Sequence, residues 1–381
     1  MKILLMCDSD MSSPGGVQQY VRNLSHALRL ARNSVIVVGP TSATRDDSME
    51  NLWSVGKPMN VPFNGSVASV PIPTQIRAIA KQVKDFAPDL VHINIPYLPT
   101  LAHRLIRRLD SDIPLVGTFH VSPYSRAMVV GSHIGAVLTH KSLARVSHLM
   151  SVSPSAQSFC RQILSRDSLV VPPICGAGQP VVRTGSIYER KDYVATFVGR
   201  LVPRKDPLTF VRAAAVAVAQ SPDMRFGLVG SGPLAASVVA EVERLGLSRS
   251  IDIHGAVTDE TRDDILRASL MSVYPSVGGE SYGIVILESV RAGSVVLAAA
   301  NPGYSHTLEN DPRALFPPRD FRTLGRLISS LAQDPRKLHD MVTVQQYLIS
   351  DKAQEIALGA ILNVYREAVK NAQLPNIWSR T

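Results

Sequence analysis

Glu280 and Glu288 are two carboxylates separated by seven residues, with turn-forming Ser-Tyr-Gly between them. A strand-like run precedes them and a helix-like apolar pattern follows, so we expect Glu280 in a loop and Glu288 about a turn and a half into a helix. Backbone N–H groups at the start of that helix, contributed by Ser281, Tyr282, Gly283 and Ile284, would bind a phosphate. Carboxylates that accept hydrogen bonds from hydroxyl groups, beside amides that bind an anion, predict a site for a sugar attached to a phosphate.

Two cations, Arg200 and Lys205, lie between another strand-like run and a helical pattern. Both side chains can converge on a pyrophosphate, and each charge-assisted hydrogen bond contributes about 1.5–3 kcal/mol. Two fixed cations would also make Mg²⁺ unnecessary for neutralising a leaving diphosphate. A solvated basic loop is the alternative for this segment taken alone.

Glycines follow two further predicted strands and permit close approach of the backbone to a ligand. Gly15 and Gly16 stand before a helical pattern, and Gly230 and Gly232 follow the run 225–229. The second pair is not a full Gly-x-Gly-x-x-Gly, so a nicotinamide cofactor is not predicted. Many strand–helix turns carry glycine for geometry only, which is the alternative for both pairs.

Two further side chains could recognise parts of a donor. Asp259, two residues after Val257, could accept hydrogen bonds from N1–H and N2–H₂ of guanine, or it could cap the helix that follows. His120 lies just past a predicted strand, at the edge where open α/β sheets bind ligands. Its imidazole could hydrogen-bond a sugar hydroxyl or interact with charge at the anomeric carbon, or it could be structural.

Two predicted helices carry basic faces. Over 74–87, an apolar stripe leaves Arg77, Lys81 and Lys84 on another face, and over 100–109 three arginines cluster at helical spacing. Such faces could rest on anionic lipid, with about 1 kcal/mol for each charge. A solvated helix surface is the alternative for either helix.

These residues require a scaffold that brings strand ends together. Short apolar runs alternate with amphipathic helical patterns, which is typical of parallel sheets covered on both faces. The Pro- and Gly-containing stretch 170–180 suits a linker and hinge between two doubly wound domains, and a helical pattern over 356–368 closes the chain. The predicted strands are 2–7, 34–38, 90–93, 115–119 and 149–152, then 193–198, 225–229, 251–253, 270–274 and 294–298.

The 381 residues carry a net charge of +9, and residues 1–175 hold 17 basic and 10 acidic side chains against 23 and 21 in the rest. A basic first half favours an anionic partner such as a phosphorylated acceptor or a membrane surface; a solubilising surface is the alternative.

Three scattered cysteines and no long apolar run predict a cytoplasmic protein. Asp8 and Asp10 could hold a metal, but turn and helix N-terminal chemistry is favoured. Aromatic residues are not interleaved with basic ones, so nucleic acid is not predicted as a partner.

Taken together, these segments resemble the family-4 glycosyltransferases of the GT-B fold, and within them the phosphatidylinositol α-mannosyltransferases. Three motifs carry the resemblance: Glu-x₇-Glu with Gly-Arg…Lys, Pro-Gly-Gly-Val-Gln at 14–18, and the segment around Asn64-Gly65-Ser66. It covers nearly the whole chain and implies two Rossmann-like α/β domains facing a central cleft. Residues 1–172, joined by a C-terminal helix at about 354–381, would bind the acceptor. Residues 173–353 would bind the nucleotide sugar.

The resemblance also implies roles for the site residues. Gly16 would approach the donor diphosphate, which Arg200 and Lys205 bind; Glu280 would hold hydroxyls of the transferred sugar and Glu288 those of the ribose. The amides of 281–283 would lie near the phosphates, and His120 beside the reacting face of the sugar. Asp259 and Arg262 fall where guanine is bound, which favours GDP-mannose, and no metal or other cofactor is implied.

The acceptor side departs from the pattern of that branch. Its usual His-x-His-Glu-Pro-Asn is replaced here by His92-Ile93-Asn94-Ile95-Pro96-Tyr97, and Arg126 is the nearby substitute for a lysine. Asn64, Arg77, Lys81, Lys84, Tyr97 and Arg126 are the candidate acceptor or membrane residues.

The prediction is therefore a retaining, metal-independent hexosyltransferase, with mannose from GDP-mannose as the favoured donor. The acceptor would be an anionic lipid or glycan such as phosphatidylinositol, at the inner membrane surface. The first alternative uses a UDP-sugar and a soluble or polyprenyl-linked glycan acceptor. A sugar-nucleotide epimerase and a non-catalytic sugar-nucleotide-binding protein are the others.

Overall fold

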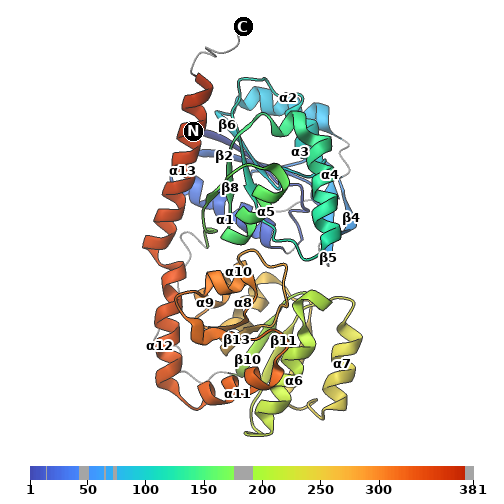
Figure 1. The fold of residues 1–381 in the computed structure, drawn as a ribbon, viewed down its shortest axis with the longest axis vertical. Helices are drawn as coiled ribbons and strands as arrows, with labels where there is room; N and C mark the ends of the chain where they lie inside the picture. The colour runs from blue at the N-terminus through green and yellow to red at the C-terminus, as the bar shows by residue number, and fades with distance from the viewer. Residues whose placement is uncertain (14, 43–50, 64–65, 72–74, 176–191, 374–381) are drawn as a thin grey trace. The chain divides into compact units, whose positions relative to one another are not determined.

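The computed structural model describes residues 1–13, 15–42, 51–63, 66–71, 75–175 and 192–373 (Figure 1). The chain forms two compact units. One comprises Met1–Gly178 together with Gln354–Thr381, and the other comprises Gln179–Ala353. Each unit is built around its own parallel sheet.

The sheet of the first unit has seven strands in the order β3-β2-β1-β6-β7-β8-β9, all paired in parallel. Successive strands move outward from β1 in one direction and from β6 in the other, so β1 and β6 flank the point where the order reverses. Open α/β sheets bind ligands at such a point. Every residue of β6 and β7 is buried, as strands covered on both faces require. The strands are β1 (Lys2–Met6), β2 (Ser34–Gly39), β3 (Leu52–Ser54), β6 (Leu90–Asn94), β7 (Leu115–Phe119), β8 (Val146–Ser151) and β9 (Leu169–Val170).

Helices and one hairpin complete the first unit. The antiparallel hairpin, β4 (Pro58–Phe63) with β5 (Ser66–Pro71), was not expected from the sequence. The C-terminal helix α13 (Asp351–Gln373) is tied to the sheet because the Tyr365 hydroxyl lies 2.7 Å from Nδ1 of His92. The other helices are α1 (Gly16–Leu30), α2 (Ile76–Phe86), α3 (Leu101–Ile106), α4 (Arg126–Leu143) and α5 (Pro154–Leu164).

The second unit repeats the pattern with six parallel strands in the order β12-β11-β10-β13-β14-β15, and the order reverses between β10 and β13. The strands are β10 (Tyr193–Val198), β11 (Phe226–Val229), β12 (Ile251–Gly255), β13 (Ser269–Tyr274), β14 (Val295–Ala299) and β15 (Leu315–Phe316). The helices are α6 (Pro207–Val218), α7 (Ala235–Arg244), α8 (Asp259–Arg267), α9 (Ile284–Arg291), α10 (Pro302–Thr307), α11 (Phe321–Ala332) and α12 (Pro335–Gln345). Short 3₁₀ turns are η2 (Pro203–Lys205), η3 (Pro312–Ala314) and η4 (Gln346–Ile349).

The predicted fold class is confirmed, because both units are parallel α/β sheets with helices between successive strands. Every strand predicted from the sequence is present, with ends that differ by up to three residues. The predicted helices over 74–87 and 100–109 are shorter, since they span Ile76–Phe86 and Leu101–Ile106. Within the described ranges, no helix combines the length and apolarity that a membrane crossing needs. The central cleft stays a prediction.

Candidate functional site

Predicted donor residues gather at one edge of the second sheet. Arg200, Gly230 and Glu280 lie in the loops after β10, β11 and β13, and Asp259 begins the helix after β12. Parallel strands place their carboxyl ends at the same edge of the sheet. The strands β10 and β13 are neighbours at the point where the strand order reverses. The fold therefore brings the cationic loop and the Glu280 loop to the same edge of the sheet.

Glu280 is held in a buried ion cluster with Arg204 and Lys205. Both cations pair with Oε1 of Glu280, and Nζ of Lys205 lies 2.9 Å from that oxygen. Burial opposes ionisation of Glu280, but the positive charges of Lys205 and Arg204 outweigh it and lower its pKa to about 2. Glu280 is therefore an ionised acceptor across the neutral range, suited to hydroxyl groups of a sugar.

Arg204 is the residue that sequence reasoning missed. Its side chain is 7% exposed, and its guanidinium also donates to the carbonyl of Gly279 at 3.3 Å. Nε of Arg204 has no hydrogen-bond partner in the described part of the chain. The turn η2 places Arg204 and Lys205 consecutively on the same carboxylate, and the Arg204 carbonyl accepts from the amide of Val277 at 2.9 Å. The Pro-Arg-Lys sequence, which places two cations side by side in a turn, was the feature of the sequence that could have indicated a role for Arg204.

Arg200 occupies a different position from its two neighbours. Its side chain is exposed, yet it lies close enough to interact electrostatically with Arg204 and Glu280. Lys205, in contrast, is engaged with Glu280 and lies 3.5 Å from the Tyr304 hydroxyl. An ammonium has three donors, so Lys205 can hold Glu280 and still donate to a phosphate. The predicted convergence of Arg200 and Lys205 on a diphosphate stays a prediction.

The glycines after β11 have a structural explanation. Gly230 has a φ of +140°, and a Cβ there would lie 1.8 Å from the carbonyl oxygen of Gly199. Gly232 packs against Leu201 in the same way, and the amide of Leu201 donates to the carbonyl of Ser231 at 2.8 Å. The close approach is thus between the protein's own loops. A donor contact at Gly230 or Gly232 stays a prediction.

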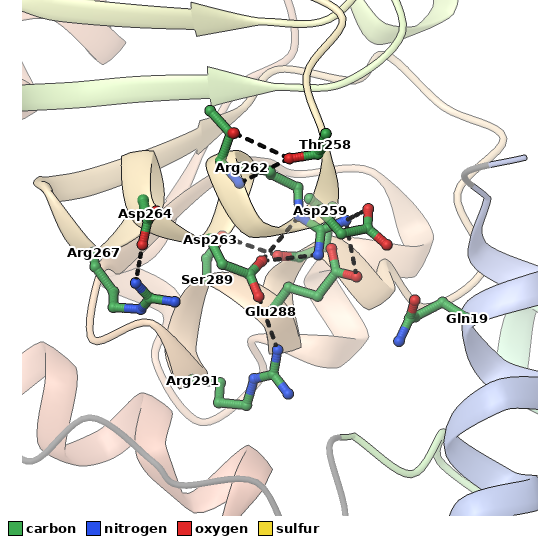
Figure 2. A network of polar contacts seen from close by, with 12 residues as sticks. Gln19, Thr258, Asp259, Arg262, Asp263, Asp264, Arg267, Glu288, Ser289 and Arg291 are labelled. Atoms are coloured by element: carbon green, nitrogen blue, oxygen red, sulfur yellow. Dashed lines mark hydrogen bonds and ion pairs between the residues drawn. The ribbon is translucent and has the colours of Figure 1, made fainter. Parts of the chain in front are cut away.

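A second polar network surrounds Arg262 on α8 (Figure 2). Its guanidinium lies 2.9 Å from Asp259, 2.8 Å from Asp263 and 3.8 Å from Glu288. The Glu288 side chain is 10% exposed, and burial raises its pKa although Arg262 opposes the shift. Glu288 lies in the second turn of α9, as predicted, and its carboxylate can accept from vicinal hydroxyl groups.

The alternative role of Asp259 as a helix cap is wrong. Thr258 is the N-cap of α8, because its hydroxyl accepts from the amide of Thr261 at 3.2 Å. Asp259 is the first helical residue and its side chain is 57% exposed. It can therefore meet a ligand while it pairs with Arg262. Contact of Val257, Asp259 and Arg262 with a base stays a prediction.

The loop before α9 has the predicted turn chemistry. Gly283 is the N-cap of α9 with a φ of +90°, and a Cβ there would collide with the ring of Tyr304. The carbonyl of Tyr282 accepts from the Thr307 hydroxyl at 2.5 Å, which holds the loop against α10. The four residues with the predicted phosphate-binding amides therefore lie where α9 begins, directly after Glu280 in the sequence: Ser281, Tyr282, Gly283 and Ile284. Their contact with phosphate is untested.

In the first unit, the predicted residues follow β1 and β7, two strands whose carboxyl ends lie at the same edge of the sheet. Gly15 is the N-cap and Gly16 the first residue of α1, which follows β1. His120 follows β7 and is buried, with Nε2 at 2.7 Å from Oδ1 of Asn94. The amide group of Asn94 donates to the carbonyl of Met6 at 2.9 Å, so its oxygen faces His120. His120 must therefore carry its proton on Nε2.

We expect His120 to remain neutral, as the Nε2–H tautomer, between pH 5 and pH 8. Burial, together with the charge of His92, lowers its pKa from 6.5 to about 3, so protonation begins only as the pH falls toward that value. Long-range ¹⁵N–¹H NMR of the imidazole nitrogens measures both tautomer and charge. Asn94→Leu should remove the tautomer preference without introducing a charge. Titration of His120 near pH 6.5 in the wild-type protein would contradict the assignment.

Asp8 and Asp10 make the turn and helix N-terminal contacts favoured from the sequence. Asp8 accepts from the Thr100 hydroxyl and from the amide of Ala102 at the start of α3, and burial raises its pKa to about 6. Asp10 accepts from Ser12 and Ser42. Among the residues that the structure describes, no group of three or more His, Cys, Asp or Glu side chains could hold a metal ion.

The acceptor residues divide into three cases. Tyr97 is wrong as an acceptor contact, because its side chain is 0% exposed and stacks on Phe119 with ring centroids 4.9 Å apart. Asn64 lies outside the described residues. Arg77, Lys81 and Lys84 are exposed on α2, and Arg126 is exposed at the start of α4. Their roles stay predictions.

Comparison with known protein families gives two matches. Residues 14–173 match the family model described as Glycosyltransferase Family 4, and residues 185–345 match Glycosyl transferases group 1. A phosphatidyl-myo-inositol mannosyltransferase of Mycolicibacterium smegmatis is 27% identical over 340 residues, which cover 88% of this chain and 85% of that protein. The protein of the same name from Propionibacterium freudenreichii is 28% identical over 326 residues, or 82% and 80% of the two chains.

Solved structures agree on the fold. The structure of TarM from S. aureus has a TM-score of 0.73 at 10% identity and covers 96% of this chain and 99% of that one. HepE from Anabaena has a TM-score of 0.69 at 17% identity, with coverage of 97% and 99%. WaaG, described as a glycosyltransferase involved in lipopolysaccharide biosynthesis, has a TM-score of 0.66 at 15% identity and covers 95% and 99%.

Proposed function

Because the chain belongs to the family-4 glycosyltransferases of the GT-B fold, we propose that it transfers mannose from GDP-mannose to an anionic lipid such as phosphatidylinositol, with retention of configuration. The observation that carries the proposal is the buried Glu280–Lys205–Arg204 cluster beside the exposed Arg200. In this arrangement the ionised carboxylate of Glu280, which would accept hydrogen bonds from sugar hydroxyl groups, lies next to cations that would bind a diphosphate. Relatives named phosphatidyl-myo-inositol mannosyltransferase support the choice of sugar and acceptor.

The proposed chemistry depends on the leaving group. As the bond between the anomeric carbon and the phosphate oxygen breaks, negative charge develops on the diphosphate and positive charge on the sugar ring. Arg200, Lys205 and the backbone amides that precede α9 would stabilise the departing diphosphate, and fixed donors are most effective where charge develops. The acceptor hydroxyl would then attack the same face of the ring, forming the new bond to the anomeric carbon and giving its proton to the departing phosphate oxygen. No metal is assigned a role.

Product analysis tests whether the acceptor is a lipid or a soluble glycan. Labelled GDP-mannose is incubated with the protein and either a lipid extract or a soluble extract, and the products are identified by mass spectrometry. The proposal requires label in an anionic lipid. Label confined to soluble or polyprenyl-linked glycans would instead support the first alternative, and conversion of the donor without any acceptor would support the epimerase.

We expect GDP to bind at least about tenfold more tightly than UDP, because the exposed carboxylate of Asp259 can accept two hydrogen bonds from guanine that uracil does not offer. Isothermal titration calorimetry measures both affinities. Asp259→Ala should reduce the advantage of GDP, whereas Glu260→Ala, at the exposed neighbouring position, should not. Tighter binding of UDP would decide for the UDP-sugar alternative.

EDTA should leave transfer unchanged, and strict Mg²⁺ dependence would contradict the metal-independent mechanism.

A further inference from the structure

The short helix α10 packs against the loop between β13 and α9. Asn301 is the N-cap of α10 and accepts from the amide of Tyr304 at 3.1 Å, and Pro302 occupies the first helical position. The side-chain amide of Asn301 also donates to the carbonyl of Ser276 at 2.9 Å, near the start of the loop. The cap of α10 therefore fixes where this helix lies relative to the loop.

The carbonyl side of the loop faces α10. A Cβ at Gly303 would collide with the carbonyl oxygen of Glu280 and would lie 3.0 Å from that of Ser281, so the first turn of the helix approaches both oxygens closely. A Cβ at Gly283 would likewise collide with the ring of Tyr304. A larger residue at either glycine would separate the loop from the helix.

Thr307, one turn further along α10, holds the next carbonyl of the loop. Its hydroxyl donates to the carbonyl of Tyr282 at 2.5 Å and lies 3.1 Å from the carbonyl of Gly303. A threonine in a helix often donates to the carbonyl four residues earlier, as Thr307 could to Gly303. A hydroxyl has one proton, however, and the shorter contact makes the loop its main partner. Thr307 is buried, so the bond is shielded from water.

This bond determines the direction of the next backbone amide. A trans peptide is planar, and its C=O and N–H point in opposite directions. Because the Tyr282 carbonyl points at α10, the N–H of Gly283 points away from that helix. Gly283 is half-buried, and its amide has no acceptor among the residues that the structure describes. The N–H can therefore donate to a ligand at the start of α9.

The same helix also reaches the cationic side of the site. The hydroxyl of Tyr304 lies 3.5 Å from Nζ of Lys205 and 3.3 Å from the hydroxyl of Ser276. Helix α10 thus contacts Lys205 through Tyr304 and the peptide before Gly283 through Thr307. Its position sets the separation of an ammonium and an amide that would bind the same diphosphate.

We propose that Thr307 is a positioning residue that aims the Gly283 amide at the phosphate groups of the nucleotide donor. The inference rests on the proposed function, which supplies that donor, and adds a residue that does not touch it. A phosphate that gains charge as the sugar departs is stabilised more in the transition state than in the ground state. A misdirected amide therefore costs rate as well as affinity.

The hydroxyl is tested with Thr307→Val, which keeps the shape of the side chain, and with Thr307→Ser, which keeps the hydroxyl. Calorimetry measures GDP binding and ligand-observed NMR measures the weaker binding of guanosine, both well below the melting temperature of each variant. Thr307→Val should bind GDP about tenfold more weakly, and guanosine, which lacks phosphate, within about twofold of wild type. Thr307→Ser should restore GDP affinity to within about twofold of wild type.

Thr139→Val is the matched control. Thr139 is also a buried helical threonine, and its hydroxyl donates to the carbonyl of Gly135, four residues earlier, at 2.8 Å. The control removes a helical bond of the same kind without a loop contact, so it should change the melting temperature but neither GDP affinity nor kcat. In Thr307→Val, kcat for transfer should fall at least about tenfold.

Three results would overturn the role of Thr307. They are full GDP affinity in Thr307→Val, an equal loss of affinity for guanosine, and no recovery in Thr307→Ser. A purely structural role gives the second result, because general loosening of the unit does not distinguish phosphate from nucleoside.

UDP separates this inference from the choice of donor, since a backbone contact with phosphate does not depend on the base. Thr307→Val should weaken UDP and GDP by the same factor. Tighter binding of UDP than of GDP by wild type, with that equal loss in the variant, contradicts GDP-mannose as the donor and supports the role of Thr307. Wild-type protein that binds neither nucleotide would overturn both.

Discussion

Replacing Glu280 with alanine is expected to lower the transfer rate at least about a hundredfold. The carboxylate is ionised, because its pKa lies at about 2, and both buried cations, Arg204 and Lys205, pair with it. Without it the sugar loses an acceptor for its hydroxyl groups, and Lys205 loses the group that orients it toward a diphosphate. Initial rates over a range of GDP-mannose concentrations separate kcat from KM. Turnover close to wild type would refute the assignment.

The variant Arg200→Ala separates function from folding in the same experiment. Arg200 is exposed, so its removal should change the melting temperature less than removal of the buried Arg204, although it interacts electrostatically with Glu280. We expect a similar loss of at least about a hundredfold in rate, because a fixed cation at the departing diphosphate acts mainly in the transition state. Arg249→Ala, at another exposed position of the second unit, is the matched control and should retain full activity.

The arrangement of both sheets could be predicted because buried parallel strands read as uninterrupted apolar runs. The apolar runs alone place Arg200, His120 and Glu280 just after strands. The Ser-Tyr-Gly turn marks the start of a helix and so places Glu288 within it. Arg204 was missed because the turn η2 folds consecutive cations back onto one carboxylate, a contact that depends on the loop after β13. Long-range loop contacts of this kind have no periodicity in the sequence.

Residues with two plausible environments were the other source of error. Tyr97 lies three residues after β6, and its ring is buried against Phe119 and Phe159, so its position in the family motif proved a poor guide to its exposure. In α4 the small residues Ser132, Gly135, Thr139 and Ser142 are buried, whereas Val130, Ile134, Val137 and Leu138 are exposed. Apolar spacing alone does not indicate which face of this helix packs inward.

Replacing Arg204 with methionine is expected to destabilise the second unit by about 3–5 kcal/mol, since it leaves Glu280 buried with one cation fewer. For a unit of this size the melting temperature should fall by roughly 6–20 °C. Differential scanning calorimetry measures the change, and Arg249→Met serves as the exposed control. Combining Arg204→Met with Glu280→Gln should restore part of the loss, because the uncompensated charge disappears.

The pH dependence of stability provides an independent check on the same cluster. Glu280 has its pKa lowered from 4.5 to about 2 by its cations despite burial, so its contribution to stability is complete above about pH 4.5 and is lost as the pH falls toward 2. Arg204→Met should raise that pKa and move the loss to higher pH. If Arg204→Met melts like wild type at pH 7 and shows the same acid transition, the paired charges do not stabilise the unit, and Arg204 does not hold Glu280 in place.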